Sequence, residues 1–88
     1  MSAVDVVVRG QVQGVGYRFH CLQEAQRLGV VGWVRNEPDG TVAGHFEGTP
    51  DAVRALVDWC RSGPAYAAVT AVEDRPAAPT GARGFSAG

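Results

Sequence analysis

The stretch VDVVVRGQVQGVGYRFHCLQEAQRLG, residues 4–29, decides the fold because it predicts a strand, a loop and a helix in succession. Residues 4–9 are rich in β-branched side chains and end at Gly10, a pattern typical of a strand. Within residues 19–28 the apolar side chains at 21, 22, 25 and 28 have helical spacing, and Gly29 follows where a C-cap is expected. The glycine-rich segment between them is the connecting loop.

The next segment predicts a β-hairpin. Residues 30–36 (VVGWVRN) are apolar and rich in β-branched residues, and EPDG at residues 37–40 has the proline and glycine of a tight turn. Residues 41–48 (TVAGHFEG) alternate between two faces, as a strand does. The two runs are therefore expected to pair as antiparallel neighbours.

A second amphipathic helix follows the hairpin. Thr49 and Pro50 supply an N-cap and an N-terminal proline, and apolar residues recur at i, i+3, i+4 and i+7 over residues 53–60. Residues 69–75 alternate again and predict a strand, whereas residues 84–87 offer only an optional fifth one.

The resulting order is β-α-β-β-α-β. Two β-α-β units whose helices cover one face of a sheet favour right-handed crossovers, which gives a ferredoxin-like α/β sandwich of the α+β class. We expect a single domain over residues 1–88, with an antiparallel sheet and both helices on one face. The third strand then lies between the first two, so Arg18, Asn36 and Thr41 are expected to meet at one edge of the sheet.

Charge and composition limit the possible functions. Of the 88 residues, 45% are apolar and 19% charged, the balance of a folded domain rather than a disordered chain. The net charge is −1 and the eight cationic residues, all arginine, form no cluster, which argues against a nucleic-acid partner. No apolar run approaches the roughly 20 residues of a membrane span, and no leader pattern is visible, so we expect a cytoplasmic protein without membrane contact.

The sequence has no pattern of metal ligands. Cys21 and Cys60 are too far apart for a zinc pair and too few for a disulfide framework, so we expect two partly buried free thiols. The topology leaves a bridge between them open, because the start of the first helix and the end of the second lie at the same end. His45 has no partner at metal spacing, and no carboxylate cluster indicates magnesium.

The glycines of residues 10–16 follow the pattern G-x-x-x-G-x-G, which is neither a dinucleotide fingerprint nor a nucleotide P-loop. A glycine-dense loop between a strand and a helix can turn several backbone N–H groups inward, and the helix dipole adds positive potential there. Arg18, at the start of the helix, can close a planar fork over an anion held by these groups. The alternative is a simple connecting turn, with Arg18 on the surface.

Two motifs resemble the signatures of the acylphosphatase family. The first is GQVQGVGYR at residues 10–18, and the second is GWVRN at residues 32–36, followed by GTV at residues 40–42 and by Gly48. The resemblance covers the whole chain and the same order of strands and helices. The chain departs from the family at two places: Gln11 stands where many relatives have a basic residue, and the end replaces an aliphatic and a basic residue with Ala87 and Gly88.

The resemblance implies a metal-independent hydrolase that needs no cofactor and splits acyl phosphates into a carboxylate and inorganic phosphate. It implies that Arg18 binds the phosphate and that Asn36 holds the attacking water. The backbone amides of the loop share the phosphate, and they belong to Gln13, Gly14, Val15, Gly16, Tyr17 and Arg18. Thr41 is a supporting candidate, as a possible hydrogen-bond partner of Asn36. We expect a monomer whose only partners are the small substrate and phosphate.

The sequence also fits two other function classes, though less well. A non-catalytic anion-binding module of the same fold is the main alternative, as found within larger proteins. An RNA-binding sheet is disfavoured by the neutral charge and by the lack of an aromatic pair on a central strand. His20 lies two residues beyond Arg18 on the predicted helix and therefore points elsewhere, so it is left out of the site.

Overall fold

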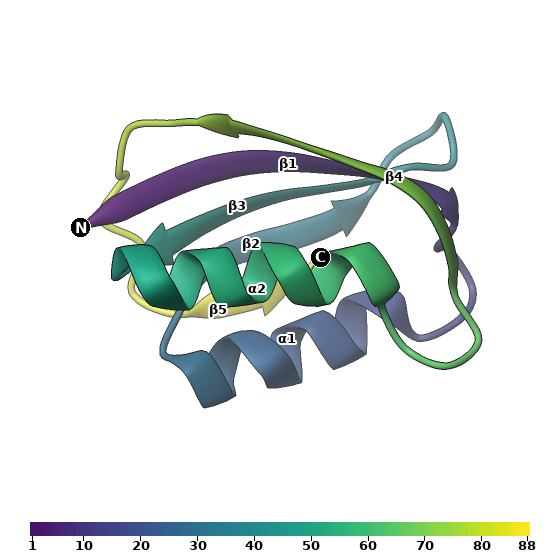
Figure 1. Cartoon of the computed structure of the whole chain (residues 1–88), viewed down its shortest axis with the longest axis horizontal. Helices are drawn as coiled ribbons and strands as arrows, with labels where there is room; N and C mark the ends of the chain where they lie inside the picture. The colour runs from purple at the N-terminus through teal and green to yellow at the C-terminus, as the bar shows by residue number, and fades with distance from the viewer.

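Two helices cover one face of a five-stranded sheet (Figure 1). The computed structural model describes residues 1–88. Every strand and helix expected from the sequence is present, including the optional fifth strand. The observed bounds are β1 Ser2–Gln11, α1 Tyr17–Leu28, β2 Val31–Asn36, β3 Val42–Gly48, α2 Pro50–Ser62, β4 Ala68–Pro76 and β5 Phe85–Ala87.

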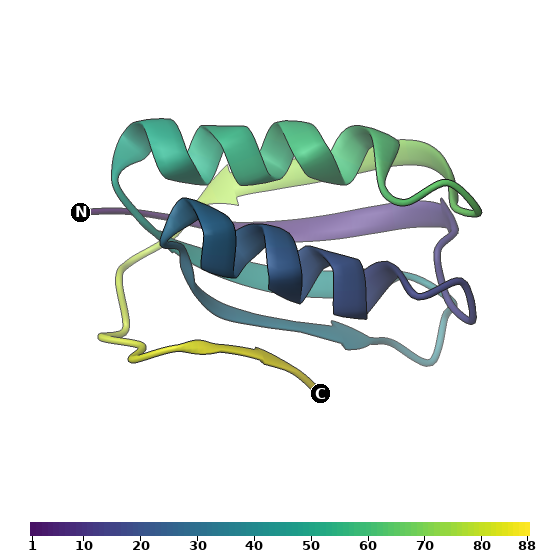
Figure 2. The same cartoon turned by 90° about the horizontal axis from the view of Figure 1, so that it is seen from below.

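The strand order is β4-β1-β3-β2-β5, so β3 lies between β1 and β2 as the connection rules predicted. The pairs β1–β3, β1–β4 and β2–β3 are antiparallel. The pair of β2 with β5 is parallel, which departs from the purely antiparallel sheet that was expected. Figure 2 shows β4 and β5 at opposite edges of the sheet, with both helices in front of it.

Val42 lies where the glycine loop after β1 and the turn after β2 leave the sheet. It pairs with Val8 of β1 on one side and with Asn36 of β2 on the other. The loop of residues 12–16 and the turn of residues 37–41 therefore lie at the same end of the molecule, on the right in Figure 1. This arrangement confirms the expected proximity of the glycine loop and the end of β2.

The core lies between the sheet and the helices, and both cysteines belong to it. α2 begins at Pro50, after Thr49, whose hydroxyl accepts a hydrogen bond from the Ala52 N–H at 3.3 Å, as the capping pattern predicted. Cys21 of α1 and Cys60 of α2 are free and fully buried, whereas partial burial was expected. A hydrogen bond with Cys60, together with burial, raises the pKa of the Cys21 thiol. Neither helix is long and apolar enough to cross a membrane.

A buried polar network fastens the segment between β4 and β5 to the sheet face opposite the helices. The ring nitrogens of His45, a residue 4% exposed, lie 2.7 Å from an Asp5 oxygen and 2.6 Å from a Glu47 oxygen. Glu47 accepts hydrogen bonds from the N–H groups of Thr80 at 2.8 Å and Gly81 at 3.2 Å, and from the Thr80 hydroxyl. The Glu47 carboxylate is completely buried, and these hydrogen bonds satisfy its oxygens.

The network shifts two ionisable groups in opposite directions. Burial by itself lowers the pKa of His45, but the hydrogen bonds to Asp5 and Glu47 and their negative charge outweigh this effect, so that the pKa is raised. Hydrogen bonds from Thr80, and further ones from His45 and Gly81, lower the pKa of Glu47 to about 2 despite its burial.

The free energy of unfolding should fall at both ends of the pH range. The lowered pKa of Glu47 gives stability that is present above its unfolded value and is lost as the pH falls towards about 2. The raised pKa of His45 gives stability that is present below its ordinary value and is lost as the pH rises through the raised one. Urea unfolding across this range measures both limbs. Glu47→Gln should flatten the acid limb, and an acid limb unchanged in this variant would contradict the assignment.

The two thiols should resist modification in the native protein. Cys21 and Cys60 are fully buried, so an aromatic disulfide reagent should label neither of them before unfolding and both in denaturant. Absorbance of the released thiolate measures the count. A count of zero in denaturant without reductant would reveal a bridge and contradict the free pair.

Candidate active site

The loop of residues 12–16 offers unused hydrogen-bond donors at the start of α1. Gly14 and Gly16 have φ angles of 76° and 77°, in the left-handed region that favours glycine. The backbone N–H groups of residues 13–16 take part in no backbone hydrogen bond of the chain. Gly16 is the N-cap of α1, no side chain caps the helix, and its first turn has no acidic residue. The positive end of this helix is therefore left open to an anion.

Tyr17 fixes the end of this loop to the core. Its hydroxyl donates a hydrogen bond to the Cys60 carbonyl oxygen at 2.8 Å, and its ring centroid lies 5.3 Å from that of Trp59. Burial, followed by the contact with Cys60, strongly raises the pKa of Tyr17. The side chain of this predicted site residue thus belongs to the core, and it is the backbone of Tyr17 that lies at the loop.

Gln13 joins the loop to the β2–β3 turn. Its side-chain amide donates hydrogen bonds to the carbonyl oxygens of Glu37 at 2.8 Å and Thr41 at 3.0 Å. These two residues flank the turn that follows Asn36. The glycine motif predicted a role only for the backbone of Gln13, because the side-chain contacts span 24 and 28 residues and no local pattern reveals them.

Thr41 has a different partner from the one expected. Its hydroxyl donates to an Asp39 carboxylate oxygen at 2.6 Å, and its N–H donates to the same oxygen at 3.0 Å. These bonds lower the pKa of Asp39. The expected hydrogen bond from Thr41 to Asn36 was therefore wrong: a turn aspartate two residues away competes better for the hydroxyl than a side chain on the neighbouring strand. Thr41 stabilises the turn that follows Asn36.

Arg18 and Asn36 line the same cavity, as the sequence predicted. The cavity has a volume of about 370 Å³ and is lined by Val12, Gly14, Gly16, Tyr17, Arg18, Phe19, Leu22, Asn36 and Ala87. Arg18 is held by the end of the chain, since its Nη1 donates a hydrogen bond to the Gly88 oxygen at 2.5 Å. Val15, also predicted at the site, lines a separate cavity together with His20, which agrees with the exclusion of this histidine.

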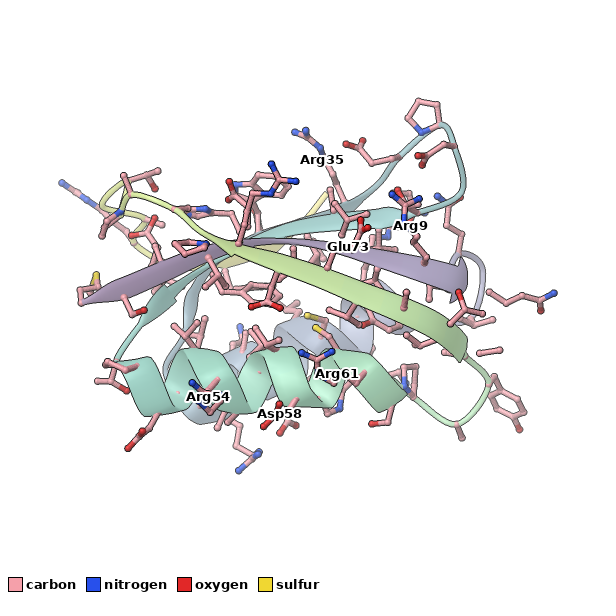
Figure 3. The ribbon with its side chains drawn as sticks, turned by 45° about the horizontal axis from the view of Figure 1, so that its top comes forward. Arg9, Arg35, Arg54, Asp58, Arg61 and Glu73 are labelled. Atoms are coloured by element: carbon pink, nitrogen blue, oxygen red, sulfur yellow. The ribbon has the colours of Figure 1, made fainter.

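Arg18 is the only charged residue among those that line this cavity. The other arginines lie elsewhere on the molecule. Figure 3 shows Arg9, Arg35 and Glu73 on the sheet face away from the helices, and Arg54, Asp58 and Arg61 on α2. Four arginines form ion pairs with carboxylates: Arg9 with Glu73, Arg27 with Glu24, Arg35 with Glu37, and Arg61 with Asp58 and Asp74. No group of three or more histidine, cysteine or acidic side chains is arranged to hold a metal ion.

A sequence model of the acylphosphatase family matches residues 4–87. The chain belongs to the acylphosphatase family. It is 58% identical over 84 residues to an acylphosphatase of Nocardioides sp., a match that covers 96% of this chain and 85% of the relative. An acylphosphatase of Thermococcus kodakarensis is 51% identical over 78 residues, which is 89% of this chain and 86% of that protein. The chain is accordingly an acylphosphatase enzyme, a hydrolase with an acyl phosphate substrate and inorganic phosphate as product.

Solved structures agree with this assignment. The crystal structure of acylphosphatase from Bacillus subtilis matches with a TM-score of 0.96 and 32% identity, covering 99% of this chain and 98% of that one. HypF of T. kodakarensis matches with a TM-score of 0.86 and 27% identity, covering all of this chain but 12% of that one. The acylphosphatase fold therefore also occurs within a much longer chain.

The glycine that opens the second acylphosphatase motif has a packing role. Gly32 has a φ of 136°, and a Cβ placed on it would lie 1.8 Å from the carbonyl oxygen of His45. No larger residue fits this close approach of β2 and β3. Gly32 thereby keeps β2 in register with β3 up to Asn36, which pairs with Val42 at the site.

Replacing Gln13 should impair hydrolysis through the turn next to Asn36. In Gln13→Glu a carboxylate would face the two carbonyl oxygens that now accept from the amide, whereas Gln13→Ala leaves these oxygens to water. We expect kcat to fall about tenfold in Gln13→Ala and about a hundredfold in Gln13→Glu, measured with an acyl phosphate. Gln26→Glu, on the exposed side of α1, is the matched control. Equal effects of the two glutamate variants would contradict a role for Gln13.

Proposed function

We propose that this acylphosphatase cleaves the carboxyl-phosphate bond without a metal ion. Arg18 and the backbone N–H groups of residues 13–18 bind the phosphoryl group, and Asn36 orients the attacking water. One observation carries the proposal: Arg18, Asn36 and the uncapped start of α1 lie around a single cavity. A dianion entering this cavity meets positive potential and no aspartate or glutamate side chain among the lining residues.

The phosphoryl oxygens would be held by donors that are already in place. The N–H groups of residues 13–16 take part in no other backbone hydrogen bond, so binding does not break existing structure. The hydrogen bond to Gly88 engages one nitrogen of Arg18 and leaves other guanidinium N–H groups for the phosphate. Fixed donors stabilise the charge on the transferring group without reorganisation, which is the main source of catalysis in such reactions.

The leaving group explains why no general acid is required. In an acyl phosphate the departing group is a carboxylate, a weak base that leaves without a proton. Water forms the new bond to phosphorus while the bond from phosphorus to the carboxylate oxygen breaks. The two protons of the water remain on the product, dihydrogen phosphate. The proton that the water must lose is taken up by a phosphoryl oxygen of the substrate, because no aspartate, glutamate or histidine side chain lines the cavity.

Asn36 has a role in orientation. A carboxamide cannot act as a base at neutral pH, but its oxygen accepts a hydrogen bond and its nitrogen donates one. Asn36 is the last residue of β2 and lines the same cavity as the loop. It would hold a water in line with the bond that breaks, which lowers the entropy cost of the attack. We further propose that the enzyme is a cytoplasmic monomer without a nucleic-acid partner.

Two substitutions separate phosphate binding from water orientation. Arg18→Lys should lower kcat/KM for benzoyl phosphate at least a hundredfold, because a point charge cannot replace a planar fork. Asn36→Ala should lower kcat by about a hundredfold while the inhibition constant of inorganic phosphate changes less than threefold. Initial rates with a chelator present measure both. Arg27→Lys, an exposed α1 arginine paired with Glu24, is the matched control and should leave the rates unchanged.

Three outcomes would contradict the proposal. Hydrolysis that survives Arg18→Ala would remove Arg18 from the site. Loss of activity with chelator, restored by a divalent cation, would overturn the metal-independent mechanism. A wild-type protein that binds phosphate but hydrolyses no acyl phosphate would support the anion-binding module instead.

A further inference from the structure

The cavity next to Arg18 is larger than a phosphate group needs. Its volume is about 370 Å³, within the range of small-molecule sites, about 300–1,000 Å³. A phosphate group has five non-hydrogen atoms. Even if each took the share of a whole water molecule in the liquid, about 30 Å³, more than half of the cavity would remain free. This remaining space is available to the acyl group of the substrate.

The walls beyond the loop are apolar. Phe19 and Leu22 of α1 line the cavity together with Arg18. Leu22 follows Arg18 by four residues and Phe19 by three, so it lies next to both on the helix surface. Ala87 of β5 also lines the cavity. Phe19 is 57% exposed, and the other large apolar residues with high exposure are Met1 and Tyr66, neither of which lines this cavity. Its ring is therefore open to a ligand rather than used in the core.

The distribution of charge excludes a second anionic group. Arg18 is the only cation that lines the cavity, and the proposed function already assigns it to the phosphate. The Tyr17 hydroxyl donates to the Cys60 oxygen, so it offers no free donor. A carboxylate on the acyl group would lose water without gaining a partner, whereas an apolar group would leave water for an apolar wall.

We infer that Phe19, Leu22 and Ala87 form an acyl-group subsite, and that this enzyme prefers uncharged, apolar acyl groups of about benzoyl size. The inference rests on the proposed function, since it takes Arg18 as the phosphate ligand. With the phosphoryl group at the start of α1, the acyl group extends along the exposed side of this helix, over Phe19 and towards Leu22. Apolar contact there strengthens binding without involving the reacting atoms.

The test compares three substrates: acetyl, benzoyl and succinyl phosphate. They share the phosphoryl group and differ in the acyl group. The acetyl group is small, the benzoyl group is apolar and aromatic, and the succinyl group carries a negative charge. Each ratio of kcat/KM in a variant is divided by the same ratio in the wild type, so that the intrinsic reactivity of the substrates cancels. Phe19→Ala should lower the benzoyl-to-acetyl ratio about tenfold, and Phe19→Leu should lower it less.

A second variant tests the charge argument. Leu22→Arg places a cation on the apolar wall and should raise the succinyl-to-acetyl ratio about tenfold. Tyr66→Ala, which removes an exposed aromatic ring outside this cavity, is the matched control and should leave all ratios unchanged. Thermal unfolding should show that Phe19→Ala folds normally, because its ring lies largely in solvent.

The outcomes distinguish this inference from the proposed function. If the wild type hydrolyses none of the three substrates, the proposed function fails, and the subsite fails with it. If it hydrolyses acetyl phosphate but the benzoyl-to-acetyl ratio is the same in Phe19→Ala, the subsite is wrong while the hydrolase mechanism stands. A wild type that prefers succinyl phosphate would also overturn the subsite.

Discussion

The double pairing of Val42 with Val8 and Asn36 is the constraint on which the site depends. It places the end of β1 and the end of β2 on two sides of one residue of β3. The glycine loop and the β2–β3 turn then emerge as neighbours, although they are far apart in the chain. The Gln13 side chain adds two hydrogen bonds across the gap and so fixes the distance between the loop and the turn. A fold with β3 at the edge of the sheet would separate the loop from Asn36.

Local patterns predicted the parts of this structure that local physics controls. The capping pattern at Thr49 and Pro50 marked the start of α2, because a cap satisfies donors within its own turn. The connection rules predicted that β3 lies between β1 and β2, because right-handed crossovers leave few topologies. The cavity shared by Arg18 and Asn36 followed from that order of strands.

The contacts that the sequence did not reveal are those between distant segments. The Gln13 amide reaches carbonyl groups of another turn, and Arg18 contacts Gly88, which is 70 residues away. Such contacts depend on which backbone segments the completed sheet brings together. Neither the residue type nor the spacing in the sequence predicts these contacts. The error at Thr41 has the opposite origin. The Thr41 hydroxyl donates to Asp39, a partner only two residues away, and this local hydrogen bond competes with the expected one across the strands.

The far face of the sheet is connected to the site through the end of the chain. Glu47 accepts hydrogen bonds from Thr80 and Gly81 and is itself paired with His45, so it fastens the segment that crosses from β4 to β5. β5 pairs with β2, and the Gly88 that follows it contacts Arg18. The orientation of Arg18 therefore depends on a strand at the sheet edge that is secured by buried charges on the opposite face. A buried carboxylate that lost these hydrogen bonds would destabilise the protein, so the crossing segment is firmly held.

The cavity also limits which phosphate compounds can react, given the proposed roles of Arg18 and Asn36. A phosphate ester presents the same phosphoryl group but releases an alkoxide, a strong base that needs a proton as it leaves. Tyr17 cannot supply this proton, because its hydroxyl is buried and donates to the Cys60 oxygen. His20 lines a different cavity. With these proposed roles, binding alone would admit many phosphates, and turnover would be confined to those whose leaving group is already a weak base.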